Sequence, residues 1–275
     1  IYSGFHIKKK IINKEKLNFK KPSIIIANHS SFLDILLLLM LNPKTIIMVK
    51  KWVYHSPIFG FFIRHSGYLF IEEGIDISIE KIKSRIKEGY SIVVYPEGTR
   101  SENGEIQRFH KGAFYIAKEL KLDIQPILIM GANEVIKKND FIIKKGVLIL
   151  SIMDRIIIDK NEDLRKVSKE IKSKMVLEKQ DLHNKHVNTK WLKNRVLNNY
   201  IYKNPVTEWY IKIKWMLENQ NYVDYDKLIG ERKTIYDMGC GYGYLSLYLH
   251  YRSKSREIIG VDYDVDKISI AENSE

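Results

Sequence analysis

Cysteine, proline and long apolar runs are scarce in this sequence of 275 residues. The single cysteine, Cys240, excludes an intramolecular disulfide and a cysteine-rich zinc site, so we predict a reducing compartment and no metal. Six prolines are too few for a disordered or fibrous chain. The longest apolar run, Ile35–Leu41, falls far short of the roughly 20 residues that a membrane-spanning helix needs.

Acidic residues are in the minority. The chain has 46 Lys and Arg against 33 Asp and Glu, a formal net charge of +13. Such a surface favours anionic partners, including phosphate groups, acidic lipids, an acidic carrier protein or nucleic acid. Hydrophobic residues make up 45% of the chain, which supplies packed cores, and the length suits two domains.

An initiator methionine and a signal peptide are also missing. The sequence starts at Ile1 and stops at Glu275, within a helical pattern. We therefore expect it to be a segment of a longer polypeptide.

Short apolar runs that alternate with helical patterns indicate an α/β domain over residues 1–159. We predict strands at residues 23–27, 46–49, 68–71, 91–95, 124–130, 141–143 and 147–152. We predict helices at residues 32–40, 75–87 and 113–120.

Residues 160–228 differ in composition and are predicted to form a basic helical connector. Residues 160–214 hold 14 basic and 6 acidic side chains. Apolar residues at helical spacing form one stripe on this basic segment, at Leu164, Val167, Ile171 and Met175. One interpretation is a solvated helix with a packed stripe; the other is contact with an anionic membrane surface or an acidic partner.

A different pattern occupies residues 229–275. A strand at 234–236 leads into a glycine-rich turn, which is followed by a helix at 244–250, a strand at 258–261 and Asp262. We interpret it as a truncated Rossmann-like β-α-β unit.

The first candidate site joins a histidine to a carboxylate. Asn28 and His29 end a predicted strand, and Asp34 lies on the first turn of the next helix. A carboxylate against one imidazole nitrogen leaves the other nitrogen as a proton acceptor for an attacking hydroxyl. Taken alone, the same residues also fit a helix cap beside a structural histidine.

A second motif follows the strand at 91–95, and strand ends are where ligands bind in α/β sheets. Arg100 supplies a fork of donors that fits phosphate, and Gly98 allows the backbone to approach a ligand closely. The alternative is a surface turn with an exposed arginine.

Together these motifs resemble the glycerolipid acyltransferase family, the PlsC-like lysophosphatidate acyltransferases. Residues 28–34 match the family's His-x4-Asp motif, and residues 95–101 match its Glu-Gly-Thr-Arg block. Residues 108–114 and 124–127 resemble two further blocks. The resemblance covers residues 1–158 and implies a mixed sheet flanked by helices.

The resemblance also implies a single-displacement acyl transfer that needs no cofactor. His29 would be the general base, oriented by Asp34. The donor would be acyl-CoA or an acidic acyl carrier protein, and the acceptor a membrane lipid such as a lysophospholipid. Residues expected to bind the substrates are Asn28, Glu97, Gly98, Thr99 and Arg100.

One departure from the family concerns the acceptor. The family's second block usually ends in an arginine, whereas this sequence has Glu72 and Glu73 there. Arg64 and Arg85 are candidate substitutes. An alternative function is therefore acyl transfer to a non-glycerophosphate acceptor in a specialised lipid or pigment pathway. A more distant alternative is a basic nucleic-acid-binding module, but the lysines are spread rather than clustered with aromatics, so we expect no nucleic-acid partner.

The glycine turn resembles the first motifs of class I S-adenosylmethionine-dependent methyltransferases. This resemblance implies that Asp237, Gly239, Gly241 and Gly243 line the methionine side of the cofactor and that Asp262 binds its ribose. A dinucleotide fold is the rival, but its glycine spacing differs. With about 40 residues of such a domain, we expect methyl transfer only in a longer chain.

The lead-in to this turn, residues 199–205 and 208–210, resembles a bacterial fusion family. That family joins an MMPL-type lipid exporter, a lysophospholipid acyltransferase and a class I methyltransferase. The resemblance implies a transporter domain in the full-length chain and a peripheral position for this segment at the cytoplasmic face of the inner membrane.

Overall fold

The chain forms two compact units, described here from a computed structural model. The larger unit comprises residues 1–143 and 147–181, and the smaller one residues 144–146 and 182–275. The structure describes residues 7–50, 69–71, 75–138, 142–159, 161–186, 189–201, 203–230, 234–253 and 255–274.

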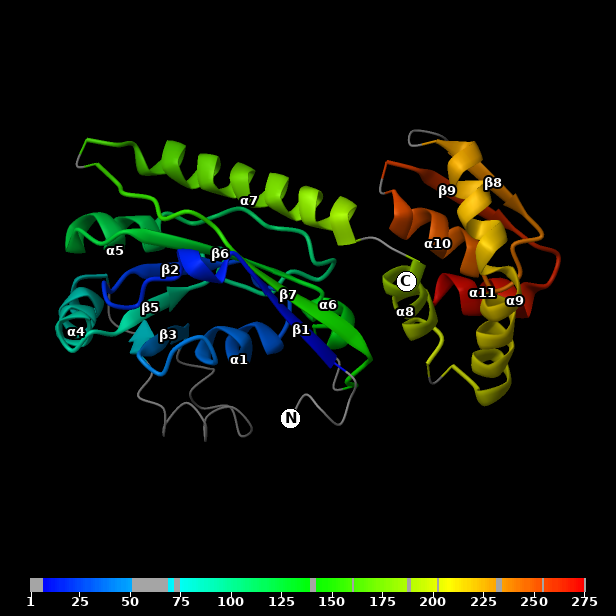
Figure 1. Ribbon diagram of the computed structural model, residues 1–275, viewed down its shortest axis with the longest axis horizontal. Coiled ribbons are helices and arrows are strands. Elements are labelled where there is room, and N and C mark those ends of the chain that lie inside the picture. Colours follow the sequence, from blue (N-terminus) through cyan, green and yellow to red (C-terminus); the bar gives the residue numbers. More distant parts are fainter. Residues whose placement is uncertain are drawn as a thin grey trace. The chain divides into compact units, whose positions relative to one another are not determined.

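The larger unit is built on one seven-stranded sheet with the order β1-β7-β6-β2-β5-β3-β4 (Figure 1). The strands are β1 (Ile7–Ile12), β2 (Ile24–Ala27), β3 (Thr45–Lys50), β4 (Leu69–Ile71), β5 (Ser91–Val94), β6 (Ile124–Met130) and β7 (Gly146–Ile152). The five consecutive strands β6, β2, β5, β3 and β4 are parallel, and β7 pairs antiparallel with β6. The predicted mixed sheet is confirmed.

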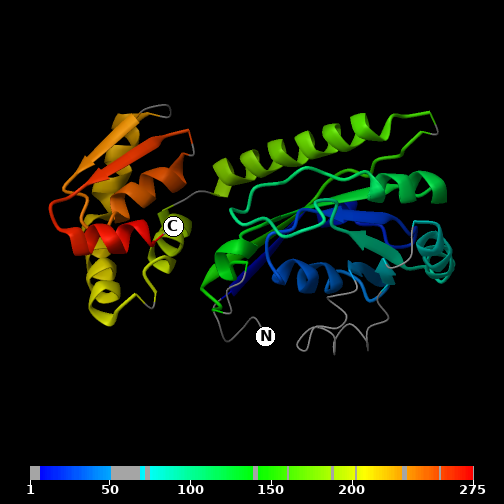
Figure 2. The same ribbon diagram turned by 180° about the vertical axis from the view of Figure 1, so that it is seen from behind.

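Helices cover both faces of this sheet, as the two opposite views show (Figures 1 and 2). They are α1 (Leu33–Leu39), α4 (Ile75–Lys87), α5 (Gly112–Leu120), the short α6 (Ala132–Val135) and α7 (Leu164–His186), and a 3-10 turn spans Lys14–Lys16. In both views α5 and α7 lie on one side of the sheet and α1 on the other. Because both faces are covered, every residue of β2 and β6 is buried.

Most of the predicted elements of this unit are present within a residue or two, and one is wrong. The strand expected at residues 141–143 is missing from its described part, because Ile142 and Ile143 lie outside any strand and Ile142 is exposed. A short apolar run is by itself an ambiguous signal, because pattern alone does not determine whether such a run forms a strand. The acidic end of the second block, with Glu72, Glu73 and Arg64, lies outside the described residues.

The smaller unit contains α8 (Thr189–Asn198), α9 (Pro205–Ile229), β8 (Thr234–Met238), α10 (Tyr244–Arg252), β9 (Glu257–Val261) and α11 (Val265–Glu272). Strands β8 and β9 pair in parallel and α10 connects them, so the predicted β-α-β arrangement is present. Its aromatic core includes Tyr200, Trp215, Tyr222 and Tyr248.

The division between the units falls inside the predicted connector, residues 160–228. The first part of α7 packs on the larger unit through buried Val167, Ile171 and Met175, three of the four residues of the predicted apolar stripe; the fourth, Leu164, is half-buried. Residues 182–228 belong to the smaller unit. Among the residues that the structure describes, no helix combines the length and the apolar character needed to cross a bilayer.

Candidate functional site

The ends of two neighbouring parallel strands bring the two predicted motifs of the larger unit together. Strands β2 and β5 pair with Ile26 opposite Val94. His29 follows the first strand by three residues from Ile26, and Glu97 follows the second by three from Val94. Because parallel strands end at the same edge of a sheet, both motifs lie at the carboxyl edge, where α/β sheets bind ligands.

His29 and Asp34 form the predicted pair. The imidazole Nδ1 lies 3.0 Å from the Asp34 Oδ2. The same oxygen accepts hydrogen bonds from the backbone N–H groups of Ser30 at 2.7 Å and Ser31 at 2.8 Å. Asp34 is completely buried, at 0% exposure, on the first turn of α1. With Nδ1 donating to this carboxylate, Nε2 is the nitrogen left to accept a proton.

Both carboxylate oxygens of Glu97 accept hydrogen bonds from backbone N–H groups. Its Oε1 accepts from the His29 N–H and its Oε2 from the Gln107 N–H, each at 2.9 Å. The residue is only 4% exposed. Burial raises the pKa of Glu97 to about 7, against the lowering effect of the two N–H donors. The acceptor contact expected for Glu97 stays a prediction; the observed contacts join the histidine turn to the loop that contains Gln107.

That loop is also attached to α7. The ammonium group of Lys179 donates to the Gly104 carbonyl at 2.8 Å and pairs with the Glu105 carboxylate at 2.9 Å. The N–H of Ser101 donates to the His29 carbonyl at 2.8 Å. The loop is therefore held from two sides, by the histidine turn and by α7.

The side chain of Asn28 forms hydrogen bonds with the protein backbone. Its side-chain nitrogen donates to the Ile129 carbonyl at 2.9 Å, and its side-chain oxygen accepts from the Ile129 N–H at 2.7 Å. It is 2% exposed. These two hydrogen bonds to β6 fix the end of β2. Substrate binding by Asn28 stays a prediction.

Gly98, Thr99 and Arg100 lie on the surface side of the same turn. Gly98 has a φ of +71°, a conformation that favours glycine. Within the described part of the chain, no acidic side chain pairs with Arg100, so its guanidinium is available to an anion. Arg85, a candidate substitute in α4, instead pairs with Glu88 at 2.9 Å.

Sequence reasoning missed Tyr95, whose ring stacks on the imidazole of His29. The ring centroids are 4.0 Å apart and the planes differ by 17°. The signal was its position directly after β5, since the register of β5 with β2 brings it to the histidine turn.

The smaller unit brings the predicted glycine turn and Asp262 together. The Asp262 Oδ2 accepts from the Gly241 N–H at 2.7 Å, and its Oδ1 accepts from the Asp264 N–H at 2.9 Å. Gly239, Gly241 and Gly243 all have positive φ, between 55° and 76°. A Cβ at Gly239 would meet nothing within 4 Å, which leaves open space above the turn.

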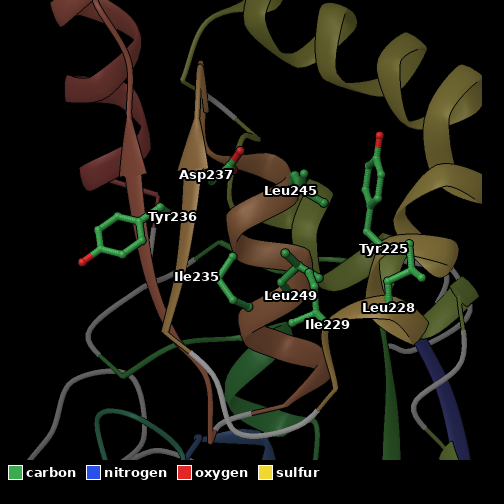
Figure 3. Close-up of a pocket in the computed structure, with 8 residues that line it drawn as sticks. All are labelled: Tyr225, Leu228, Ile229, Ile235, Tyr236, Asp237, Leu245 and Leu249. Atoms are coloured by element: carbon green, nitrogen blue, oxygen red, sulfur yellow. The ribbon is translucent and has the colours of Figure 1, made fainter.

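Asp237 lies near the end of β8, two residues before Gly239, and cofactor binding by Asp237 stays a prediction. Its carboxylate accepts a hydrogen bond from the Ser246 hydroxyl at 2.6 Å. It borders an open pocket of about 320 Å³ between β8, α9 and α10. The other residues that line this pocket are apolar or aromatic: Tyr225, Leu228, Ile229, Ile235, Tyr236, Leu245 and Leu249 (Figure 3).

Comparison with known proteins shows that the larger unit is similar to acyltransferases. Residues 8–130 match the family model Acyltransferase. The 1-acyl-sn-glycerol-3-phosphate acyltransferase of Saccharomyces cerevisiae is 32% identical over 152 residues, which are 52% of this chain and 50% of that protein. The enzyme of the same name from Helicobacter pylori is 30% identical over 132 residues, 45% of this chain and 56% of that one.

A solved structure agrees with these relatives. The 1-acyl-sn-glycerophosphate acyltransferase PlsC of Thermotoga maritima superimposes with a TM-score of 0.56 at 26% identity, over 65% of this chain and 75% of that one. The chain spans about half the length of the curated relatives it matches. The larger unit thus resembles PlsC in its fold, a mixed sheet flanked by helices, and its residues 8–130 match the Acyltransferase model.

Proposed function

We propose that the larger unit transfers a fatty acyl group from an acyl thioester to a hydroxyl of a lysophospholipid. The observation that carries this proposal is the His29–Asp34 pair, held at the carboxyl edge of the sheet beside the turn that contains Arg100. The relatives named 1-acyl-sn-glycerol-3-phosphate acyltransferase support the substrate class.

In the proposed reaction His29 acts as the general base. Its Nε2 takes the proton from the acceptor hydroxyl as the hydroxyl oxygen attacks the thioester carbonyl. The tetrahedral intermediate then expels the thiolate, which receives the proton from the imidazolium and leaves as the free thiol. The buried Asp34 carboxylate holds the ring in the required tautomer and stabilises its positive charge.

Arg100 is proposed to hold the phosphate of the acceptor. Its planar guanidinium can bind two phosphate oxygens at once, which a lysine cannot do. Glu72 and Glu73 favour the second candidate function, transfer to a non-glycerophosphate acceptor of a specialised lipid or pigment pathway.

The donor is proposed to be acyl-CoA or an acidic acyl carrier protein. The net charge of +13 supports both donors, because each is anionic. It also supports a peripheral position on an anionic membrane surface, which we propose to be the cytoplasmic face of the inner membrane.

We further propose that the glycine turn of the smaller unit is the start of an S-adenosylmethionine site in a longer fusion protein that includes a transporter. The positive φ angles of its glycines and the Asp262 carboxylate beside Gly241 fit that group. When bound, S-adenosylmethionine supplies an electrophilic methyl group. Asp262 would accept hydrogen bonds from ribose hydroxyls, and the glycines would admit the methionine part. Calorimetry with S-adenosylmethionine tests this part, and we expect weak binding in this chain.

A thiol-release assay tests the main proposal. The chain is incubated with acyl-CoA or acyl carrier protein and a panel of lyso-lipids that differ in headgroup. We expect release that depends on the acceptor and is fastest with a phosphorylated one. Fastest release with a neutral acceptor would favour the second candidate. Salt-sensitive DNA binding without thiol release would contradict both.

A further inference from the structure

We propose that Tyr95 is a positioning residue for His29, holding the plane of the imidazole and stabilising the imidazolium that forms when the base accepts a proton. This inference rests on the proposed function of His29. It goes beyond the predicted motifs, which assign roles only to Asn28, His29, Asp34 and residues 97–100.

The sheet brings the two rings together. Ala27 ends β2 and Val94 ends β5, and the two strands are parallel neighbours. Tyr95 is the next residue after β5, and His29 is two residues beyond β2. The centroid distance of 4.0 Å and the interplanar angle of 17° mean that the phenol ring covers one face of the imidazole.

This contact supplies a constraint that the carboxylate does not. The bond from Nδ1 to Asp34 fixes the tautomer and the direction of one ring nitrogen. A ring held by one hydrogen bond can still tilt about that bond, because χ2 of histidine is a soft torsion. A ring stacked on one face restricts that tilt, so Nε2 keeps its direction towards the acceptor hydroxyl.

The contact also favours the charged form of the base. An aromatic face attracts a cation, at about 0.5–2 kcal/mol depending on exposure. The neutral imidazole of the ground state has little of this attraction, whereas the imidazolium of the transition state has all of it. A contact that is stronger in the transition state raises kcat rather than substrate affinity.

Three tyrosine variants test the proposal by kcat and KM in the thiol-release assay. Tyr95→Leu removes the aromatic face, and we expect kcat to fall roughly 3- to 30-fold while KM changes by less than about twofold. Tyr95→Phe keeps the face and should stay within about twofold of the wild type. Tyr90→Leu is the matched control, because Tyr90 directly precedes β5 at its other end; it should retain wild-type kcat.

Two further measurements separate a stacking role from loss of fold. Thermal unfolding gives the folded fraction, and if Tyr95→Leu is unstable, Tyr95→Met provides the same comparison. The proton resonances of the His29 ring, assigned by their loss in His29→Gln, should lie upfield in the wild type and in Tyr95→Phe and move downfield in Tyr95→Leu.

Each result has one meaning. Folded Tyr95→Leu with wild-type kcat would overturn the stacking role, as would Tyr95→Phe falling as far as Tyr95→Leu. If His29→Ala keeps its thiol release, the general-base function fails instead, whatever the tyrosine variants do.

Discussion

Each unit of this protein has a carboxylate just after a parallel strand. In both units this carboxylate accepts hydrogen bonds from two backbone N–H groups. In the larger unit it is Glu97, bonded to His29 and Gln107. In the smaller unit it is Asp262, bonded to Gly241 and Asp264.

The pKa values of the two carboxyl groups are nevertheless shifted in opposite directions. Burial raises the pKa of Glu97 to about 7, whereas the two N–H donors hold the pKa of Asp262 below its ordinary value. The local bonding is the same, so the difference comes from the surroundings. Glu97 is buried beyond the end of β5, at the carboxyl edge of a seven-stranded sheet with both faces covered, whereas Asp262 lies at the end of a two-stranded sheet whose β9 is largely exposed.

The largest expected effect is on the buried site. His29→Ala should reduce thiol release at least about 100-fold, because a general base usually contributes that much. Asp34→Asn should lose most of the activity as well, since the carboxylate no longer fixes the tautomer. The control is His250→Ala, in the smaller unit, which should behave as wild type. Activity retained by both site variants would contradict the mechanism.

The second expected effect is on the free energy of unfolding of the larger unit, and it tests the raised pKa of Glu97 directly. Between the ordinary value of 4.5 and the folded value of about 7, folded Glu97 holds a proton that the unfolded chain has lost. The contribution of Glu97 to the free energy of unfolding therefore falls as the pH rises through this window. Glu97→Gln has no such titration. The wild-type-minus-variant difference should fall by about 2–3 kcal/mol between pH 4.5 and 7.5.

Hydrogen exchange of the slowest amides of β2 and β5 measures that difference, because these strands report opening of the larger unit. Glu119→Gln is the control, since Glu119 is an exposed residue of α5. A difference that is independent of pH would show that Glu97 ionises as freely as an exposed glutamate, and the contrast with Asp262 would disappear.

The third expected effect concerns substrate binding at the edge of the buried site. Arg100→Lys replaces a two-point fork by a point charge, so KM for a phosphorylated acceptor should rise about tenfold with little change in kcat. Arg108→Lys serves as the control, because Arg108 is exposed in the following loop. An unchanged KM for Arg100→Lys would indicate a neutral acceptor, or a phosphate bound elsewhere.

The sequence alone predicts the parts of both units that depend on local pattern. Apolar runs identify β2, β5 and β6, and the helical spacing of α4 gives its bounds to the residue. Strand β1 was missed because three consecutive lysines interrupt it and half of its residues are exposed. The run at 141–143 was overestimated for the opposite reason, since it is apolar but lies outside any strand in its described part.

The candidate site follows the same rule. The His29–Asp34 pair is local, five residues apart, and could be predicted. The bonds of Glu97 to His29 and the stack of Tyr95 join segments 66 or more residues apart. They depend on which strands are neighbours and in which register, and pattern does not determine that. The same holds for Asn28, whose amide bonds to Ile129 across the sheet.

The smallest expected effect concerns Asp262, the more exposed of the two carboxylates. Its replacement should change only the local exchange rate of a backbone amide. Asp262→Asn keeps one acceptor oxygen and loses the other, so the Gly241 or the Asp264 N–H loses its partner. Water can replace that partner here, because Asp262 is half-exposed. We therefore expect the Gly241 amide to exchange several-fold faster at neutral pH, while the amides within β8 and β9 keep their rates.

The pH dependence of this local effect has the opposite sign to that of Glu97. Because the folded pKa of Asp262 is lowered, its stabilising contribution is present at neutral pH and is lost as the pH falls below the ordinary value of 3.8. The wild-type and Asp262→Asn exchange rates of the Gly241 amide should therefore converge in acid. A higher protection factor of that amide in acidified wild-type protein, or global loosening of the smaller unit by Asp262→Asn, would mean that Asp262 behaves like a buried carboxylate. Burial by the surrounding sheet would then no longer account for the difference between the two sites.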